Sequence, residues 1–279
     1  MIREFFAALV NPGVPFIRYA LIAGLLSSIS FGIIGSFVVV KRISYIAGAI
    51  SHAALAGIGG ALYLRHAYGI ESISPLHGAV VAALAAAFII GMVTTRYKER
   101  EDTVIGTIWA IGMAIGLLFI SKTPGYVDPM SYLFGNILLV GRQELYLILI
   151  LDLLVITVGI LFYQQFLALS FDEEFTKLRG IRTQLYYILL IFLIALTVVL
   201  MVTVVGIVMV IALLTIPAAT AGIFSKKLWH MMVLGGILCA LFTSLGLGTS
   251  YMLDLPSGST TIVIAGIIYL LSLGSRRFT

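Results

Sequence analysis

The sequence predicts an all-α membrane protein, a polytopic bundle of eight or nine transmembrane helices. Composition is the first reason. Hydrophobic residues make up 61% of the 279-residue chain and charged residues only 10%, whereas a soluble domain carries about 25% charged residues. The second reason is that apolar runs of about 20 residues, enough to cross a bilayer as a helix, recur from one end to the other. We therefore expect one transmembrane domain over residues 1–279, with no separate soluble domain.

Nine apolar runs are long enough to cross the hydrocarbon. The run over residues 185–224 carries no charge. As one helix it would be about 60 Å long, so it must cross twice, and we expect the turn near Gly206. If one run is re-entrant, the number of spans falls to eight. The predicted spans cover residues 18–40, 44–64, 76–95, 103–121, 144–163, 185–204, 206–224, 229–251 and 259–274.

The basic residues between the spans predict the orientation. Alternate loops hold twelve and five lysines and arginines, and the richer set belongs on the cytoplasmic side. This places the C-terminus in the cytoplasm and, with nine spans, the N-terminus outside. The net charge of +5 therefore reflects membrane topology, and we expect no nucleic-acid partner.

Residues 128–140 (DPMSYLFGNILLV) are apolar but too short to cross the membrane. Asp128 is a helix N-cap type, and the proline that follows it suits the first helical position. The segment falls on the outer side in the predicted topology. We expect an interfacial or re-entrant helix there.

The inner stretch of residues 170–180 (SFDEEFTKLRG) predicts a short helix in a cytoplasmic loop. Ser170 and Glu173 have the spacing of a capping box, and Gly180 suits the C-cap. The apolar residues of the stretch fall at i, i+4 and i+7, on one face; they are Phe171, Phe175 and Leu178. A helix this short needs support from outside itself. Either the membrane surface or a groove on a partner protein would cover the face.

The chain carries no sequence motif for nucleotide hydrolysis. A P-loop requires G-x-x-x-x-G-K-[ST], and no glycine in this sequence is followed by lysine. The G-x-S-x-G, H-E-x-x-H and C-x-x-C motifs are also absent. We therefore expect a transport protein rather than an enzyme, and if ATP drives transport, a separate polypeptide must supply the ATPase.

Two ionisable residues lie deep inside predicted spans, where such residues are functional candidates. His52 is eight residues from the start of the second span and Asp152 eight residues from the start of the fifth, each about 12 Å deep. Imidazole and carboxylate both bind first-row divalent metals. From the residues alone, His52 could instead be a packed, hydrogen-bonded histidine, and Asp152 a protonated or paired carboxyl.

Five segments together resemble the ABC-3 family, the permeases of zinc, manganese and iron ABC importers. No single segment is decisive, but the set follows the family's order over nearly the whole chain. The segments are residues 41–57 (KRISYIAGAISHAALAG), 128–135 (DPMSYLFG), 171–180 (FDEEFTKLRG), 213–221 (LLTIPAATA) and 254–263 (DLPSGSTTIV).

The resemblance implies a type II ABC importer fold, with two permease copies around a central path. It implies that residues 170–180 form the coupling helix that docks on the ATPase subunit, with Phe171, Asp172, Phe175, Leu178 and Gly180 as its main residues. It also implies that the outer Asp128 and Asp254 lie at a gate or contact an extracytoplasmic metal-binding protein.

The resemblance further places His52, with the neighbouring Ser51, in the metal path. Many family members carry an aspartate four residues before this histidine, but here the position is Gly48. Either the site is weaker and transient, or another helix supplies a carboxylate, for which Asp152 is the candidate.

The resulting hypothesis is the permease subunit of an ABC importer for divalent metals in a prokaryotic plasma (inner) membrane, with zinc first and manganese or iron next. No cofactor is bound permanently, and the metal is cargo. The expected partners are ABC ATPase subunits, the extracytoplasmic metal-binding protein and a second permease copy. The alternative is a self-sufficient secondary transporter or channel. Such a protein usually has more charge within the membrane and inverted repeats.

Overall fold

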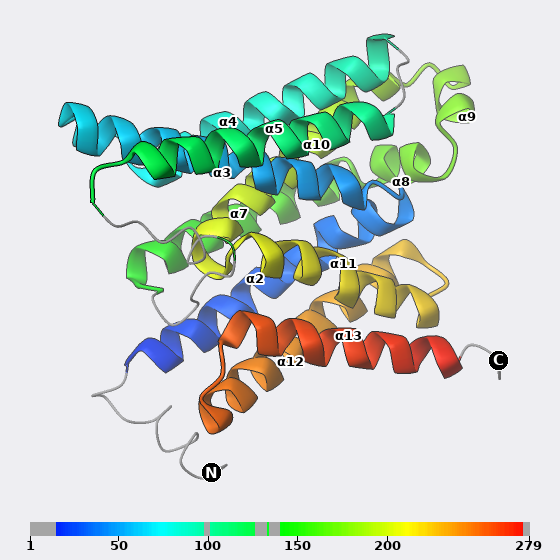
Figure 1. Ribbon diagram of the computed structural model, residues 1–279. Coiled ribbons are helices and arrows are strands. Elements are labelled where there is room, and N and C mark those ends of the chain that lie inside the picture. Colours follow the sequence, from blue (N-terminus) through cyan, green and yellow to red (C-terminus); the bar gives the residue numbers. More distant parts are fainter. Residues whose placement is uncertain (1–14, 98–100, 126–132, 134–139, 276–279) are drawn as a thin grey trace. The chain divides into compact units, whose positions relative to one another are not determined.

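The computed structural model describes residues 15–97, 101–125, 133 and 140–275 (Figure 1). Regular structure in these residues is helical throughout. Nine of the described helices are long and apolar enough to cross a membrane. The predicted fold class is therefore confirmed. Helix ends differ from the predicted spans by several residues in places, because the chain often stays helical beyond its apolar run.

The chain divides into two compact units, each described here by itself. The first contains α2 (Pro15–Val40), α7 (Arg142–Leu161), α11 (Ile207–Phe224), α12 (Leu228–Leu253) and α13 (Ser257–Ser275). The second contains α3 (Ser44–Tyr68), α4 (Pro75–Met92), the π-helical turn η1 (Val93–Tyr97), α5 (Glu101–Lys122), α8 (Tyr163–Phe171), α9 (Glu173–Leu178) and most of α10 (Thr183–Val205). The single transmembrane domain over residues 1–279 stays a prediction.

In the first unit, α2 packs against α7, α11 and α12, and α13 packs against α11 and α12. Glycines allow the helix backbones to approach closely, as is common between membrane helices. A Cβ atom at Gly32 of α2 would lie 2.6 Å from the backbone nitrogen of Gly236 in α12. One at Gly35 would lie 2.2 Å from the carbonyl oxygen of Leu214 in α11. A larger residue at either position would push these helices apart.

In the second unit, α3 packs against both α4 and α5. The G-x-x-x-G pair of α5, Gly112 and Gly116, faces the backbone of α3. A Cβ atom at Gly112 would lie 2.7 Å from the Cα atom of Ala53, and one at Gly116 2.8 Å from the carbonyl carbon of Leu55. This pair therefore packs two helices of the same chain.

Several helix ends follow from local sequence. Ser74 caps α4: its hydroxyl accepts a hydrogen bond from the backbone N–H of His77, and Pro75 occupies the first helical position. Gly69 ends α3 with a left-handed φ of 70°. The chain turns at Gly206, between α10 and α11, with a φ of 85°. The predicted turn in the long uncharged run is thus confirmed, and it needs glycine because L side chains strain at positive φ.

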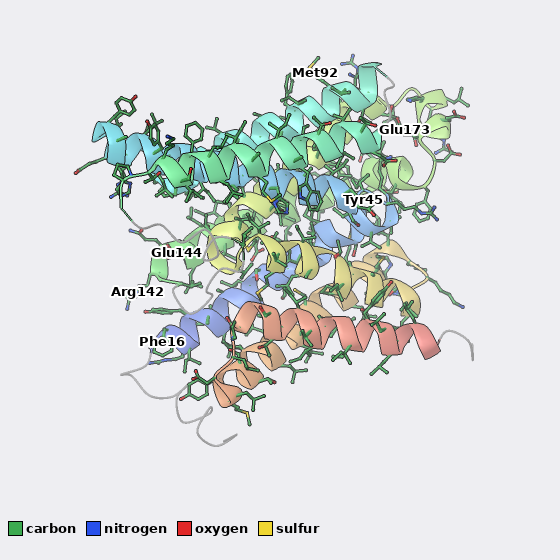
Figure 2. All side chains as sticks on the ribbon, in the orientation of Figure 1. Phe16, Tyr45, Met92, Arg142, Glu144 and Glu173 are labelled. Atoms are coloured by element: carbon green, nitrogen blue, oxygen red, sulfur yellow. The ribbon has the colours of Figure 1, made fainter. Side chains whose placement is uncertain are left out.

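Large apolar side chains cover much of the surface of both units. Leu118 on α5, Leu153 on α7 and Leu270 on α13 are each more than 60% exposed. Carbon atoms dominate the side chains along the long helices in Figure 2. Contiguous apolar surface of this kind is unusual on a soluble monomer and suits contact with lipid.

Candidate functional site

His52 lies in the middle of α3, packed against α5. Its side chain is 8% exposed, and its ring stacks on the indole of Trp109, with 4.6 Å between ring centroids and 24° between the ring planes. The Nδ1 atom is buried and has no hydrogen-bond partner among the described residues. A buried imidazole nitrogen without a partner is unusual and leaves a lone pair or a proton available to a ligand.

Trp109 fills the space that Gly48 leaves beside His52. A Cβ atom at Gly48 would lie 2.4 Å from Cζ3 of the Trp109 ring, so any larger residue there would displace the indole. Where the resembling family often has a carboxylate, this chain therefore has an aromatic wall. Sequence reasoning missed Trp109, and the only signal for it was the unusual glycine four residues before the histidine.

Ser51 lies beside His52 and is completely buried. Its hydroxyl donates a hydrogen bond of 2.8 Å to the carbonyl oxygen of Ala47, one turn earlier in α3. The hydroxyl proton of Ser51 is thus engaged in a hydrogen bond within α3, and the hydroxyl oxygen keeps its lone pairs.

Asp152 lies in α7 of the first unit and is 4% exposed. Its Oδ1 atom accepts a hydrogen bond from the hydroxyl of Ser30 in α2. Its Oδ2 atom is buried without a hydrogen-bond partner in the described part of the chain. The carboxyl group is therefore partly satisfied, and one oxygen is open to a proton or a cation.

His52 belongs to the second unit and Asp152 to the first, and each position is described here by itself. Within the described residues, no group of three or more histidine, cysteine, aspartate or glutamate side chains could hold a metal ion.

The segment predicted as one short helix over residues 170–180 consists of two pieces. The first helix, α8, ends at Phe171, and Asp172 is extended, with a φ of −151°. The second, α9, covers only Glu173–Leu178. Gly180 follows with a left-handed φ of 76°, as predicted for the end of the helix.

The predicted capping box between Ser170 and Glu173 is wrong. Ser170 lies inside α8 and donates to the carbonyl oxygen of Phe166, one turn earlier. The Glu173 carboxylate instead faces Lys41 and Lys177. A serine hydroxyl inside a helix readily bonds to its own preceding turn, and spacing alone does not reveal this competition.

The predicted apolar face is correspondingly divided. Phe171 ends α8 and Leu178 ends α9, and both side chains are exposed, by 72% and 86%. They do not share one helix, because the chain is extended between them at Asp172, which is also exposed. The side chain of Phe175 lies outside the described part. Two large apolar groups thus remain uncovered in a short polar segment.

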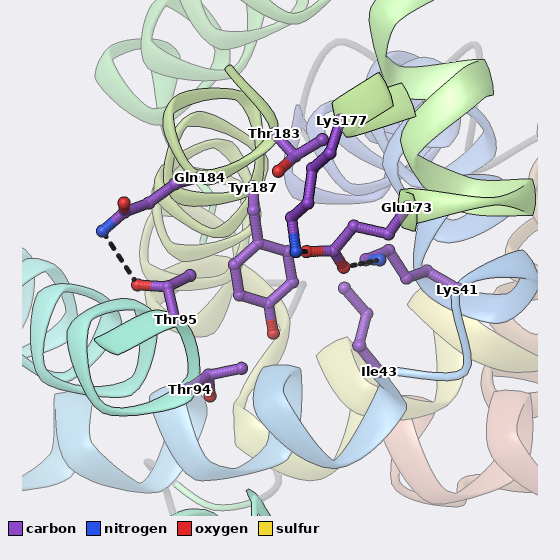
Figure 3. Close-up of a pocket in the computed structure, with 9 residues that line it drawn as sticks. All are labelled: Lys41, Ile43, Thr94, Thr95, Glu173, Lys177, Thr183, Gln184 and Tyr187. Carbon is purple, nitrogen blue, oxygen red and sulfur yellow. Dashed lines mark hydrogen bonds and ion pairs between the residues drawn. The ribbon is translucent and has the colours of Figure 1, made fainter. Parts of the chain in front are cut away.

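A small polar pocket lies beside this segment (Figure 3). Its volume is about 290 Å³, and its lining includes Lys41, Glu173, Lys177 and Gln184. Burial alone would raise the pKa of Glu173, but hydrogen bonds and charge from the two lysines outweigh burial and hold the pKa below its ordinary value. The glutamate is therefore ionised at neutral pH and forms an ion pair with each lysine.

Of the two aspartates predicted on the outer side, the structure describes only one. Asp128 lies outside the described residues. Asp254 is exposed and ends α12 with a left-handed φ of 52°, a conformation that aspartate tolerates better than most residues. The turn is closed by the hydroxyl of Ser250, which donates to the carbonyl oxygen of Leu255. A contact of either aspartate with a binding protein stays a prediction.

Comparisons with known proteins agree over almost the full chain. The model of the ABC 3 transport family matches residues 13–276. The chain is 42% identical to the "Probable metal transport system membrane protein" of Chlamydia trachomatis over 264 residues, 94% of this chain and 90% of that protein. It is 32% identical to the manganese import system permease protein ScaB of Streptococcus parasanguinis, over 98% of this chain and 94% of the relative.

A solved structure shows the same arrangement of helices. The chain matches a chain of PsaBC from Streptococcus pneumoniae, determined in complex with Fab, with a TM-score of 0.83 and 30% identity. The match covers 98% of this chain and 95% of that one. Because the family is one of transport proteins, the prediction of a transport protein rather than an enzyme is confirmed. Because the family model matches nearly the whole chain and one relative is 42% identical over 94% of it, the chain belongs to the ABC 3 transport family.

Proposed function

We propose that the chain is the permease subunit of an ABC importer for divalent metal ions. The observation that carries this proposal is His52, a buried imidazole deep in a membrane helix whose Nδ1 atom has no partner among the described residues. Within a transport family, such a nitrogen is well suited to contact a passing transition metal. The metal is cargo, and we propose no permanently bound cofactor.

Manganese is the first candidate for the metal. Sequence analysis favoured zinc, and imidazole suits zinc and iron better than manganese, which prefers oxygen ligands. The preference for manganese therefore does not come from His52. The Streptococcus parasanguinis relative is named for manganese import, and this moves manganese ahead of zinc and iron.

His52 and Ser51 form one side of the proposed path, with Trp109 behind the imidazole. A single imidazole, with a serine oxygen beside it, gives an ion weak and transient ligands, which suits conduction better than tight binding. Asp152 is the proposed second position, since its Oδ2 atom is open.

The protein lies in the plasma (inner) membrane of a prokaryote, with its C-terminus in the cytoplasm. This orientation rests on the twelve-to-five distribution of basic residues between alternate loops. It places α8 and α9 on the cytoplasmic side, where an ATPase acts. It also places Asp128 and Asp254 on the outer side, where a metal-loaded binding protein would deliver its ion.

ATPase subunits dock on the α8–α9 segment, which is the coupling segment of this proposal. The exposed Phe171 and Leu178 supply the apolar contacts, in the manner of a short helix laid in a groove. ATP binding would then move a permease homodimer between outward and inward openings. This chain has no P-loop, which is consistent with hydrolysis on the partner.

A histidine substitution tests the function. The complete complex, with ATPase and binding protein, is reconstituted in liposomes, and Mn²⁺ uptake is compared with Zn²⁺ uptake. We expect His52→Leu and His52→Ala to reduce uptake by at least about tenfold while insertion and assembly stay normal, because leucine fills the volume but offers no ligand. His230→Leu, at an exposed histidine of α12, is the matched control and should transport normally.

Two outcomes would contradict the proposal. Normal uptake by His52→Leu would remove His52 from the path. Metal uptake by the purified chain without ATPase subunits would instead favour a self-sufficient secondary transporter or channel.

A further inference from the structure

The side chain of Lys41 reaches from the start of α3 to the junction between α8 and α9. Its ammonium group donates a hydrogen bond of 3.1 Å to the carbonyl oxygen of Leu169 in α8. It also lies 3.4 Å from Oε2 of Glu173, the first residue of α9. Only 13% of the Lys41 side chain is exposed. A single side chain thus joins the turn before α3 to two consecutive short helices that lie more than 120 residues further along the chain.

Helix geometry explains why a cation belongs at this junction. The last four carbonyl groups of a helix have no partner within it, and Leu169 is in the last turn of α8. The C-terminal end of a helix also attracts positive charge, and the N-terminal end attracts negative charge. Lys41 therefore caps α8, and Glu173 occupies the favourable first turn of α9.

The surroundings hold the ammonium in this position. Lys41 also lies 5.3 Å from the centroid of the Tyr187 ring in α10, a cation–π distance. Figure 3 shows Glu173 between Lys41 and Lys177, and Lys177 bonds to the other carboxylate oxygen at 3.0 Å. Exposed ion pairs contribute little, but this ammonium is largely buried and has three different partners.

The turn that carries Lys41 leads directly into α3. The next residue, Arg42, has a left-handed φ of 60°, which is uncommon for a residue other than glycine. The helix begins at Ser44, and His52 is about 12 Å further along it. Because a helix is stiff over this length, a displacement at its start moves the imidazole as well.

We propose that Lys41 is a positioning residue that anchors the α8–α9 segment to the start of α3. Through this anchor, a displacement of the segment by the ATPase reaches the helix that carries His52. The inference rests on the proposed function, in which α8 and α9 form the coupling segment. It adds the physical connection between that segment and the ion path.

The test measures coupling in the complete complex. Mn²⁺ transported per ATP hydrolysed is compared among wild type, Lys41→Gln, Lys41→Arg and Arg42→Gln in proteoliposomes. Lys41→Gln should lower this ratio by roughly two- to thirtyfold with normal assembly. Lys41→Arg keeps the charge and should restore most of the ratio. Arg42→Gln is the matched control, since Arg42 is exposed in the same turn and has no ion pair within the described residues.

Glu173→Gln tests the anchor from its other end. It leaves the turn before α3 intact, so it decides the question even if Lys41→Gln fails to fold. We expect a smaller fall than with Lys41→Gln, because Lys41 keeps its bond to the carbonyl oxygen of Leu169. The double variant should be no worse than Lys41→Gln alone, because that substitution already removes the ion pair with Glu173. An unchanged ratio in Lys41→Gln, or in Glu173→Gln where Lys41→Gln does not assemble, would overturn the proposal.

Leu178→Asp separates this inference from the proposed function. If Leu178→Asp uncouples transport and the Lys41 and Glu173 variants do not, the coupling segment stands and only the anchor is wrong. If Leu178→Asp also leaves the ratio unchanged, the proposed coupling role of α8 and α9 fails. The anchor is supported only if all three substitutions uncouple transport and Arg42→Gln does not.

Discussion

The ring of His52 is held between its own helix and the indole of Trp109, at a point where α3 has glycine. The stacking distance of 4.6 Å between centroids is a favourable aromatic geometry. Gly48 is necessary for it, because a Cβ atom there would overlap the indole. The orientation of the candidate ligand thus depends on the absence of a side chain one turn away.

A double-mutant cycle measures this dependence. Gly48→Ala should reduce the free energy of unfolding by about 1–3 kcal/mol, as overpacking does. Trp109→Ala should also destabilise the protein. The combined Gly48→Ala/Trp109→Ala variant should be at least about 1 kcal/mol more stable than the sum of the single effects predicts, because the overlap disappears with the indole. Unfolding by SDS titration in mixed micelles gives these values.

Gly60→Ala is the control for the cycle. Gly60 lies on the same helix, and the nearest atoms to an added Cβ are 3.8 Å away in the Phe119 ring. Alanine at this position should change the free energy of unfolding by no more than about 1 kcal/mol. The change should be stabilising, because alanine has a higher helix propensity than glycine. Additive effects of Gly48→Ala and Trp109→Ala would contradict the proposed overlap.

Among the secondary-structure elements, α8 and α9 are two short helices separated by a single extended residue. Asp172 is extended between the two helices, and the carbonyl of Asp172 accepts hydrogen bonds from both the backbone N–H and the hydroxyl of Thr176. The extended residue turns Phe171 and Leu178 outward on separate helices. Six helical residues are too few to be stable alone, even with the ion pair between Glu173 and Lys177 within α9. The contacts of Lys41 therefore help to hold α9 in place.

Leu178→Asp should uncouple ATP hydrolysis from metal transport. A carboxylate buried in an apolar groove without a partner costs several kcal/mol, which is enough to prevent docking. The membrane helices should fold normally, because Leu178 is 86% exposed. Co-purification of the ATPase, together with the ratio of Mn²⁺ uptake to ATP hydrolysis, checks this. Leu178→Met keeps an apolar side chain and should behave as wild type; normal coupling in Leu178→Asp would exclude the docking role.

Over the full chain, the exposed apolar side chains fit a protein surrounded by lipid. Packed helices such as α3, α4 and α5 approach each other closely through glycines, so the interior of a unit is filled with side chains. A path for ions is then more easily built between two permease copies than inside one.

We expect two permease copies in each active complex. Light-scattering mass in detergent, corrected for the micelle, should give this number with and without the ATPase subunits. Cross-linking in native membranes should give the same stoichiometry, which controls for dissociation in detergent. An active complex with a single permease copy would contradict the homodimer.

The spans and several helix ends follow from local sequence. Apolar runs must be long enough to cross the hydrocarbon, and an uncharged run of residues 185–224 must turn, which it does at Gly206. Ser74, Pro75 and Gly180 likewise act through local backbone rules. These features depend on neighbours in the chain and on the membrane as a solvent, so no tertiary information is needed.

The surroundings of the functional residues depend instead on how distant helices pack. Trp109 reaches His52 from another helix, and Lys41 caps a helix more than 120 residues further along the chain. Ser170 had the spacing of a capping box, yet its hydroxyl bonds within α8, while the carboxylate of Glu173 pairs with Lys41. Contacts between distant segments depend on which faces pack together, and periodicity and capping rules, which act over one or two turns, carry no information about that.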